Sequence, residues 1–481
     1  MTNRIPCPVV EAARLFCGHT ALVDPARAQS FDSFDRQTSA VAHLLTDHGL
    51  REGDRLALVM ENSAAMVLAI AACVRLGVVF CPLNTRWPMA MHVDAIESIG
   101  AKAVISERDL KHGLIIRIED VQTAARDSHD EPVVDPPLRS PDAPAGIVFT
   151  SGSAAEPKAV LHTLGNYHFN ALGSNRNIRF GPGDRWLLSL PLYHVGGLGI
   201  LFRALAGGGA VVVAARDEHT LEAIRRYRVT HLSLVTTQLR RLLSAGEDLK
   251  TLSRQIKALL VGGSTVPDVL IHRACDYGLP VYKSYGLTEM ASQVTTTSPQ
   301  DLPARLATSG CPLEYREIQI NEQREILVRG QTLFAGYVKK DEITRPVDDD
   351  GWFATGDLGR FDREGYLTVF GRRDNMFVSG GENVMPEMIE RALCSLDGVE
   401  DALVVPIEDA EYGHRPVAFV KTPAGTLLQA EDMRRSLTPL IPRYAMPVRY
   451  LPWPESIAGT GLKPLRSEFA RLLSTGDSPK S

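Results

Sequence analysis

The sequence lacks the cysteine patterns that mark a metal site or a disulfide framework. Its seven cysteines are scattered, odd in number and without a Cys-X-X-Cys pair, which argues against zinc and favours a reducing cytosol. A membrane span is missing too, because the most apolar helix-like stretch, residues 64–74, ends at Arg75 and is too short to cross a bilayer. The first eight residues lack the charged and then apolar pattern of a secretory signal. We therefore expect a cytoplasmic protein without stable membrane insertion.

Charge of one sign is not in excess either. The formal net charge is −5 and the isoelectric point is about 6.2, so the chain has no general attraction for nucleic acid or anionic membranes. Any polyanion must therefore be held by a local site. With 481 residues, 44% of them hydrophobic, the chain is long enough for two or more domains with a substantial core.

The first two thirds of the chain alternate apolar runs with helical segments. Residues 55–59, the apolar helix and residues 77–80 indicate a strand-helix-strand unit. The same alternation recurs at residues 186–190, 210–214, 231–235 and 258–261. We expect an α/β fold in which the large N-terminal part has mostly parallel sheets.

The pattern changes after Thr355. Short alternating runs with Gly or Asp turns, such as residues 365–371, predict antiparallel hairpins and thus a β-rich part. From Asn375 onward a compact α+β part is expected, with Pro386 as the first residue of a helix that reaches Leu393. Strands are expected near residues 402–405 and 417–420.

A charged run at residues 372–375 separates two apolar segments and marks the expected domain joint. The chain is therefore expected to consist of a large N-terminal domain, residues 1–372, and a small mobile C-terminal domain, residues 373–481.

A candidate phosphate-binding loop lies at residues 150–160, T-S-G-S-A-A-E-P-K-A-V. It follows an apolar run at residues 146–149 that predicts a buried strand, so its backbone N–H groups would emerge at a sheet end and face an anion. The spacing of a Walker A loop is missing. Taken alone, such a Ser/Gly/Lys cluster is more often a solvated turn.

Five further clusters follow this loop in order along the chain. They are P-L-Y-H-V-G-G at residues 191–197, Y-G-L-T-E at 285–289, T-G-D at 355–357, G-R-R-D at 371–374 and G-L-K-P-L-R at 461–466. In order and spacing these motifs resemble the AMP-forming adenylate synthetases, the superfamily of acyl-CoA ligases, luciferases and peptide-synthetase adenylation domains. The resemblance covers nearly the whole chain. Within it, the flanking runs W-L-L-S-L-P-L-Y-H-V-G-G-L-G-I, Y-G-L-T-E-M-A-S-Q-V, G-R-R-D-N-M-F-V-S-G-G-E-N-V and E-Y-G-H-R-P-V-A are similar to the o-succinylbenzoate-CoA ligase family of menaquinone biosynthesis.

The resemblance implies a ligase that uses ATP, Mg²⁺ and CoA. Its acid would be activated as acyl-AMP with release of pyrophosphate, and the acyl group would then pass to CoA. The small-molecule partners would be the carboxylic acid, ATP and CoA, with no nucleic acid, and the assembly a homodimer or homotetramer.

The same resemblance assigns the nucleotide site. Lys463 would reach the substrate carboxylate and the α-phosphate, Glu289 would bind Mg²⁺, and Thr288 would contact the α-phosphate. Residues expected to act in catalysis are Lys463, His194, Thr288 and Glu289. Residues expected to bind ATP or AMP are Thr150, Ser151, Gly152, Ser153, Lys158, Gly263, Ser264, Thr265, Tyr285, Gly286, Thr288, Asp357, Arg372 and Lys463. Asp357 and Arg372 would contact the ribose, and the ring of Tyr285 would face adenine.

Acid binding and thiol access follow from the same comparison. His194 is expected at the carboxylate end of the acyl pocket. Residues expected to make room for the acid or to donate hydrogen bonds to it are Gly196, Gly197, Ala291, Ser292 and Gln293. The turn Ser379, Gly380 and Gly381 would border the CoA tunnel, and Asp374 would be the hinge on which the small domain swings.

Ala154 and Ala155 depart from the superfamily, which usually has Thr-Gly there. The change removes a hydroxyl donor and the residue that most easily adopts left-handed geometry. Three alternatives therefore stay open: a CoA ligase for another aromatic or medium-chain acid, a catalytically silent nucleotide-binding protein, and an enzyme that adenylates substrates for a carrier protein.

Overall fold

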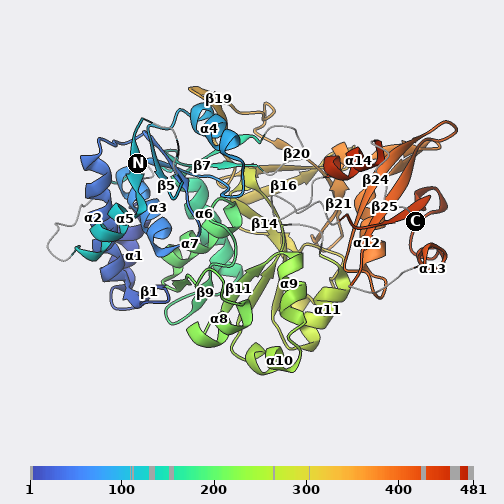
Figure 1. Cartoon of the computed structure of the whole chain (residues 1–481), viewed down its shortest axis with the longest axis horizontal. Helices are drawn as coiled ribbons and strands as arrows, with labels where there is room; N and C mark the ends of the chain where they lie inside the picture. Colours follow the sequence, from blue (N-terminus) through green and yellow to red (C-terminus); the bar gives the residue numbers. More distant parts are fainter. Residues whose placement is uncertain are drawn as a thin grey trace.

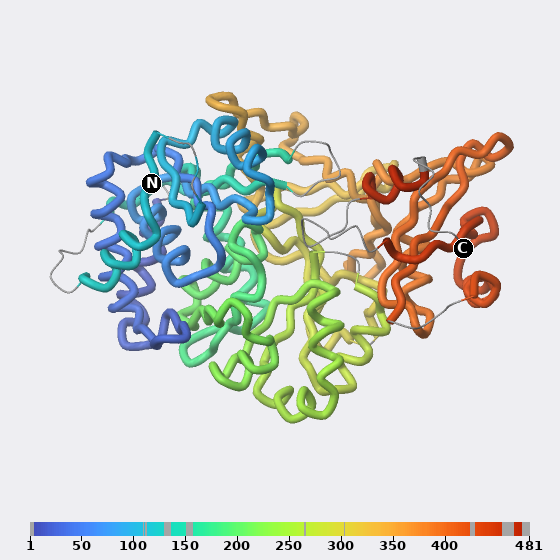
Figure 2. Tube along the Cα trace, viewed as in Figure 1, coloured from blue at the N-terminus to red at the C-terminus, as the bar shows by residue number. Residues whose placement is uncertain are grey.

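The computed structural model describes residues 4–108, 110, 113–128, 136–150, 157–263, 266–302, 304–423, 429–454 and 466–474. The described chain forms two large mixed sheets, a smaller antiparallel sheet and a C-terminal sheet. In Figure 1 the N-terminal helices lie at the left and the C-terminal elements at the right, and Figure 2 traces the same path as a tube.

The first large sheet has the strand order β19-β18-β8-β7-β4-β3-β5-β6. The pairs from β7 through β4, β3 and β5 to β6 are parallel, whereas β7, β8, β18 and β19 pair antiparallel. Its strands are β3 (Arg55–Val59), β4 (Val79–Pro82), β5 (Ala103–Ser106), β6 (Ile115–Arg117), β7 (Pro144–Phe149), β8 (Ala159–Thr163), β18 (Gly336–Lys339) and β19 (Glu342–Thr344).

The expected strand-helix-strand unit is confirmed in this sheet. Helix α3 (Ala64–Leu76) connects the parallel strands β3 and β4. The hydroxyl of Ser63 accepts a hydrogen bond from the N–H of Met66 and caps the helix start, and Gly77 ends it in the left-handed conformation. Nearly all of α3 is buried because its side chains are apolar on every side, which is typical of a helix enclosed by other elements.

The second large sheet has the order β15-β14-β13-β12-β11-β9-β10-β1-β2 and is parallel from β13 to β1. Its strands are β1 (Thr20–Val23), β2 (Ala28–Ser30), β9 (Arg185–Leu187), β10 (Ala210–Val212), β11 (His231–Leu234), β12 (Ala258–Val261), β13 (Val281–Leu287), β14 (Ser292–Thr296) and β15 (Cys311–Pro312). The four strands expected here are confirmed, although three of them are shorter than their apolar runs. One hydrophobic core joins both large sheets, since it contains Leu56 and Leu58 of β3 together with Val211 of β10.

The helices of the large part connect and cover these strands. They are α1 (Pro8–Phe16), α2 (Phe31–Asp47), α4 (Met89–Ser98), α5 (Ile118–Arg126), α6 (Leu164–Asn177), α7 (Val195–Gly207), α8 (Thr220–Tyr227), α9 (Thr236–Leu243), α10 (Glu247–Ser253) and α11 (Asp268–Asp276), with 3-10 turns η1 (Thr288–Met290) and η2 (Pro299–Asp301). No helix within the described residues combines the length and the apolar character needed to span a bilayer.

The β-rich part is an antiparallel sheet of order β16-β17-β20-β21, which confirms the expected hairpins. Its strands are β16 (Arg316–Ile320), β17 (Glu325–Gly330), β20 (Phe353–Phe361) and β21 (Leu367–Arg372). The turn η3 (Arg373–Asn375) follows β21 directly and leads into the C-terminal part.

The C-terminal part is the smaller α+β unit that the sequence predicts. Its elements are β22 (Phe377–Ser379), β23 (Glu382–Val384), α12 (Pro386–Cys394), β24 (Asp401–Asp409), β25 (Gly413–Lys421), α13 (Ala430–Leu437), η4 (Arg443–Ala445), β26 (Arg449–Pro452) and α14 (Arg466–Ser474). Helix α12 begins at Pro386, as predicted, because proline suits the first helical turn. Two hydrophobic cores consist only of residues from Phe377 onward, so this unit has its own interior.

Candidate active site

The ends of the candidate phosphate loop are held by the β7–β8 hairpin. The N–H of Thr150 donates to the carbonyl of Lys158 at 2.9 Å, and the N–H of Lys158 donates to the hydroxyl of Thr150 at 3.1 Å. The exposed Lys158 ammonium lies 4.9 Å from the centre of the Tyr337 ring. The loop therefore starts and ends at one sheet edge beside strand β18.

Strand β13 and the turn η1 carry the next group of predicted residues. Contrary to the expected strand end at Tyr285, β13 continues to Leu287, because Tyr285, Gly286 and Leu287 pair with β14. Thr288 and Glu289 then occupy η1 at the carboxyl end of the strand. The hydroxyl of Tyr337 donates to Glu289 Oε1 at 2.7 Å, so Glu289 lies next to the phosphate-loop lysine.

The β20–β21 ribbon adds the third group. Asp357 and Arg372 are paired across the ribbon, with Arg372 Nη1 3.6 Å from Asp357 Oδ1. The hydroxyl of Tyr285 donates to Asp357 Oδ2 at 2.7 Å and thereby joins β13 to β20. Arg372 also reaches Asp374 in η3, with Nη2 3.3 Å from Oδ2.

These contacts bring together four segments that are far apart in the sequence. Lys158, Tyr337 and Glu289 form one chain of contacts, and Tyr285, Asp357 and Arg372 form the other. The carboxylates of Asp357, Asp374 and Glu289 raise the pKa of Arg372, although its burial acts in the opposite direction. The two chains of contacts thus share one electrostatic environment.

Burial shapes the tyrosines of this cluster. Burial, together with the carboxylate of Asp357, raises the pKa of Tyr285 far above its ordinary value. Burial and the carboxylate of Glu289 do the same to the pKa of Tyr337. Both phenols therefore remain neutral hydrogen-bond donors at physiological pH.

Part of the predicted nucleotide set lies outside the described residues. This holds for Ser151, Gly152, Ser153, Ala154, Ala155, Ser264, Thr265 and Lys463. Gly263 is described and follows β12, two residues after that strand ends at Val261.

His162 supports the site and was missed by the sequence analysis. Its Nε2 lies 2.7 Å from the carbonyl oxygen of Thr288, so Nε2 must carry the proton and donate. Nδ1 then accepts from the hydroxyl of Tyr167 at 3.2 Å. The pair fixes the backbone of η1, where Thr288 and Glu289 lie.

Burial lowers the pKa of His162 to about 4, against the opposing effect of its bond to Thr288. The unfolded chain binds a proton near pH 6.5 that the folded chain refuses, so stability from this residue is present above pH 6.5 and is lost as the pH falls toward 4. The loss is about 3 kcal/mol. We expect the thermal midpoint of the wild type to fall between pH 7 and pH 5, and to fall less in His162→Gln.

His231 provides the internal control, since burial lowers its pKa to about 4 as well and its contribution remains in the variant. Equal falls in the thermal midpoint for the wild type and His162→Gln would contradict the assignment of this pH dependence to His162.

The expected acid-pocket residues lie at the start of α7 and on β14. His194 is the N-cap residue of α7, and its ring packs 4.8 Å from that of Tyr193. Gly197 lies in the first helical turn, where an added Cβ would collide with the carbonyl of Pro191. The absence of a side chain at Gly197 therefore serves the close packing of the helix on residues 190–191.

Ser292 and Gln293 differ in their surroundings. Ser292 follows Ala291 in a turn with positive φ at both residues and is partly exposed. Gln293 is 3% exposed, and its Oε1 accepts hydrogen bonds from Ser174 and Arg203, each at 2.7 Å. Its Nε2 donates to Thr296 at 2.8 Å. The amide of Gln293 is thus engaged within the protein, which favours a supporting position over direct contact with an acid.

Arg203 is a further residue that the sequence analysis missed. It projects from α7, is 1% exposed and contacts β14 through the Nη2 bond to Gln293. Burial lowers its pKa to about 9. Within the described residues, its Nε and Nη1 have no hydrogen-bond partner and no carboxylate forms an ion pair with it. A buried cation with unsatisfied donors therefore lies between the two acid-pocket segments.

The expected CoA-tunnel turn joins β22 and β23. Gly380 and Gly381 both have positive φ, as the tight two-residue hairpin between Ser379 and Glu382 requires. The N–H of Gly380 donates to the carbonyl of Tyr412 at 2.9 Å, so the turn is anchored to the start of β25. Its described contacts are within the C-terminal part.

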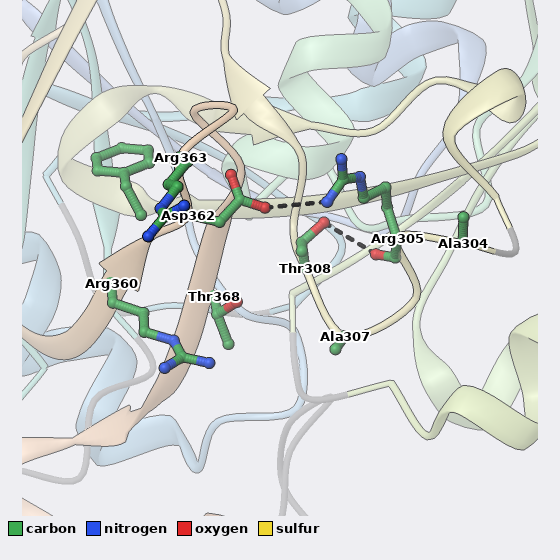
Figure 3. A pocket seen from close by; sticks show the side chains of 9 residues that line it. Ala304, Arg305, Ala307, Thr308, Arg360, Asp362, Arg363 and Thr368 are labelled. Carbon is green, nitrogen blue, oxygen red and sulfur yellow. Dashed lines mark hydrogen bonds and ion pairs between the residues drawn. The ribbon is translucent and has the colours of Figure 1, made fainter.

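A hollow of about 490 Å³ lies elsewhere on the β-rich part (Figure 3). It is lined by Arg305, Arg360 and Arg363 among others, and by none of the predicted site residues. Arg305 is already bound by Asp362 at 3.2 Å and lies 4.6 Å from the centre of the Tyr366 ring. The nucleotide site is therefore assigned to the contact cluster and not to this hollow.

Magnesium fits the donors of the cluster. Among the described residues, no group of three or more His, Cys, Asp or Glu side chains could hold a metal ion alone. Glu289 offers a carboxylate of which one oxygen, Oε1, is held by Tyr337. A single carboxylate that shares the ion with phosphate oxygens and water is the arrangement that Mg²⁺ commonly takes beside nucleotides.

Comparison with known families agrees with this geometry. Residues 9–338 match the family described as AMP-binding enzyme, and residues 388–456 match the AMP-binding enzyme C-terminal domain. The chain therefore belongs to the AMP-binding enzyme family, which confirms the resemblance and the expected fold class.

Individual relatives narrow the class. The 2-succinylbenzoate–CoA ligase of Bacillus subtilis is 32% identical over 436 residues, which cover 87% of this chain and 88% of that protein. The ligase of the same name from Salmonella typhimurium is 35% identical over 419 residues, 86% of each chain.

The solved structures agree with these relatives. One is the o-succinylbenzoate CoA synthetase (MenE) of Bacillus subtilis in complex with the acyl-adenylate intermediate OSB-AMP. It has a TM-score of 0.86 and 29% identity, with coverage of 97% of this chain and 98% of that one. Another structure of that enzyme, in complex with ATP and a magnesium ion, also has a TM-score of 0.86 and 29% identity, with coverage of 97% and 100%.

Proposed function

We propose that the chain is an ATP-dependent ligase that activates o-succinylbenzoate as acyl-AMP and transfers the acyl group to CoA. The observation that carries the proposal is the meeting of Lys158, Glu289, Asp357 and Arg372 through the contacts of Tyr337 and Tyr285. Relatives with the matching name and similar structure support the choice of acid.

The reaction needs two anions to approach each other. A carboxylate oxygen attacks the α-phosphate, the bond from that phosphorus to the bridging oxygen of pyrophosphate breaks, and acyl-AMP forms. The sulfur of CoA then attacks the acyl carbon, its proton is lost, and AMP leaves with the oxygen that came from the acid. The first step requires fixed positive charge, and the second requires space for a thiol.

The described residues can divide the nucleotide between them. Asp357 is oriented by the O–H of Tyr285 and faces Arg372, so its carboxylate can accept both ribose hydroxyls beside a guanidinium. Thr150 and Lys158 bracket the loop that would receive the β- and γ-phosphates. Thr288, held through its carbonyl by His162, would present its hydroxyl to the α-phosphate. Mg²⁺ would supply charge neutralisation, with Glu289 as its protein ligand.

Lys463, on the C-terminal part, is assigned to the carboxylate and α-phosphate during adenylation. The thiol can approach only after this lysine has left, so the small domain must reorient about Asp374. That residue lies in η3, its side chain is 59% exposed, and its described partner is Arg372. The boundary between residues 372 and 373 and the Ser379–Gly381 contribution to the thiol tunnel belong to the same proposal.

Stiffening this pivot should separate the half-reactions. We expect Asp374→Pro to lower thioester formation about tenfold and to leave acid-dependent pyrophosphate release within twofold of the wild type, because proline restricts the backbone that must rotate. Single-turnover measurements of each half-reaction test this expectation. Asp374→Ala is the control, since it removes the ion pair to Arg372 without restricting the backbone; normal CoA turnover in the proline variant would contradict the hinge.

The second carboxylate of o-succinylbenzoate is assigned to Arg203. A dicarboxylic acid brings one anion that reacts and one that must be neutralised, and this buried guanidinium has donors to spare between α7 and β14. His194, Gly196 and Ser292 would line the remaining pocket, with Gln293 holding Arg203 in place.

A panel of acids tests the proposal directly. Pyrophosphate, AMP and CoA thioester should form with o-succinylbenzoate at a higher kcat/KM than with benzoate-like or medium-chain acids under one CoA concentration. Preference for another acid would replace the substrate assignment, and ATP binding without any acid-dependent turnover would favour the silent nucleotide-binding alternative. We place the reaction in the cytoplasm, with a homodimer or homotetramer to be distinguished by sedimentation velocity.

A further inference from the structure

Tyr337 lies where two chemically opposed groups approach each other. Strand β18 pairs antiparallel with β8, and Tyr337 is opposite Val160, two residues after Lys158. The same strand follows Phe334, whose N–H donates to the carbonyl of Glu289 at 2.8 Å. The register of one strand pair therefore sets Tyr337 between the phosphate-loop lysine and the carboxylate of η1.

Each face of this tyrosine has a partner of opposite chemistry. Its hydroxyl donates to Glu289 Oε1 at 2.7 Å, and its ring centre lies 4.9 Å from Lys158 Nζ. The ring of Phe334 packs edge-on against it at 4.9 Å and limits its rotation. The tyrosine is half-buried, so its position is fixed by packing as well as by these two contacts.

A lysine and a glutamate so close together would otherwise attract each other directly. A direct ion pair would occupy both groups and leave neither for the charges of a nucleotide. Tyr337 prevents this because the ring face attracts the ammonium while the phenol binds one carboxylate oxygen. Lys158 stays available to phosphate, and the second oxygen of Glu289 stays available to a cation.

We propose that Tyr337 is a positioning residue that keeps Lys158 and Glu289 apart and orients Glu289 toward the metal ion of MgATP. This inference rests on the proposed function, since it takes Glu289 as the ligand of Mg²⁺ and Lys158 as a contact of phosphate. It assigns to the phenol a role that no motif of the sequence indicates.

The test is calorimetric titration of ATP into the wild type and Tyr337→Phe, in Mg²⁺ and in EDTA. The wild type should bind ATP more tightly in Mg²⁺. Tyr337→Phe keeps the ring and loses the hydroxyl, so it should lose about tenfold of this Mg²⁺-dependent gain, the effect of one hydrogen bond to a charged group. Its affinity for AMP should equal that of the wild type. Tyr337→Leu, which also loses the ring, should in addition weaken ATP binding in EDTA.

Tyr227→Phe is the matched control. Tyr227 also donates to a carboxylate, Glu218 at 2.9 Å, and also has a cation over its ring, Arg226 at 5.3 Å, but it lies on α8 outside the contact cluster. This variant should retain the full Mg²⁺-dependent gain. An unchanged gain in Tyr337→Phe overturns the inference and leaves the proposed function standing. A wild type that binds ATP equally with and without Mg²⁺ overturns the metal role of Glu289, and this inference with it.

Discussion

Lys463→Ala should lower acid-dependent pyrophosphate release by about 10²- to 10³-fold, the usual cost of removing one group that stabilises charge in a transition state. Adenylation brings a carboxylate against a triphosphate, and the lysine is the one positive group assigned to the point where these anions meet. Transfer of a supplied acyl-AMP to CoA should proceed within twofold of the wild-type rate, because Lys463 has left the site before that step. Rapid-quench measurement of each half-reaction separates the two effects.

A second lysine of the C-terminal part provides the control. Lys421 forms an ion pair with Glu400, 3.7 Å apart, and its side chain is 49% exposed. Lys421→Ala removes an equal charge from the same unit and should leave both half-reactions unchanged. Equal losses of adenylation and thioester formation in Lys463→Ala would contradict the role given to Lys463.

Arg203→Met should lower kcat/KM for o-succinylbenzoate about 100-fold, mainly through KM. The substitution removes the buried charge assigned to the second carboxylate, and a buried anion left without its hydrogen-bonded partner costs several kcal/mol. Two mono-acid analogues, each lacking one of the carboxylates, identify the effect. The analogue that keeps only the reacting carboxylate should bind Arg203→Met at least as well as the wild type.

Arg316→Met separates this specificity effect from damage to the core. Arg316 is also buried, burial lowers its pKa to about 9, and it contacts the same Gln293. Its donors bind the backbone carbonyls of Gln293, Glu314 and Asn170, which marks it as structural. This variant should affect dicarboxylic and monocarboxylic acids alike. Equal losses for both acid classes in Arg203→Met would remove the second-carboxylate assignment.

The sequence predicted those features whose causes are local. Strand β12 has the bounds of its apolar run, and α12 begins at the predicted Pro386, since burial pattern and fixed proline φ act within a few residues. The clustering of Asp357 with Arg372 was also expected, because both motifs resemble parts of one known site and fall on neighbouring strands.

The supporting residues could not be predicted because their partners are distant in the sequence. His162 contacts Thr288 across 126 positions, Arg203 contacts Gln293 across 90, and Tyr337 contacts Glu289 across 48. A buried histidine on an apolar strand, an arginine in an apolar helix and a tyrosine after a glycine carry no local pattern that names a partner. Sheet register and helix packing decide these contacts.

Oxygen transfer from acid to nucleotide tests the central claim most directly. Purified protein should be given o-succinylbenzoate labelled with ¹⁸O in its carboxylates, together with ATP, Mg²⁺ and CoA, and the products weighed by mass spectrometry. One ¹⁸O should appear in each AMP, with unlabelled pyrophosphate and one CoA thioester formed per AMP. Unlabelled AMP, or label in phosphate or pyrophosphate, would contradict activation of the acid through acyl-AMP.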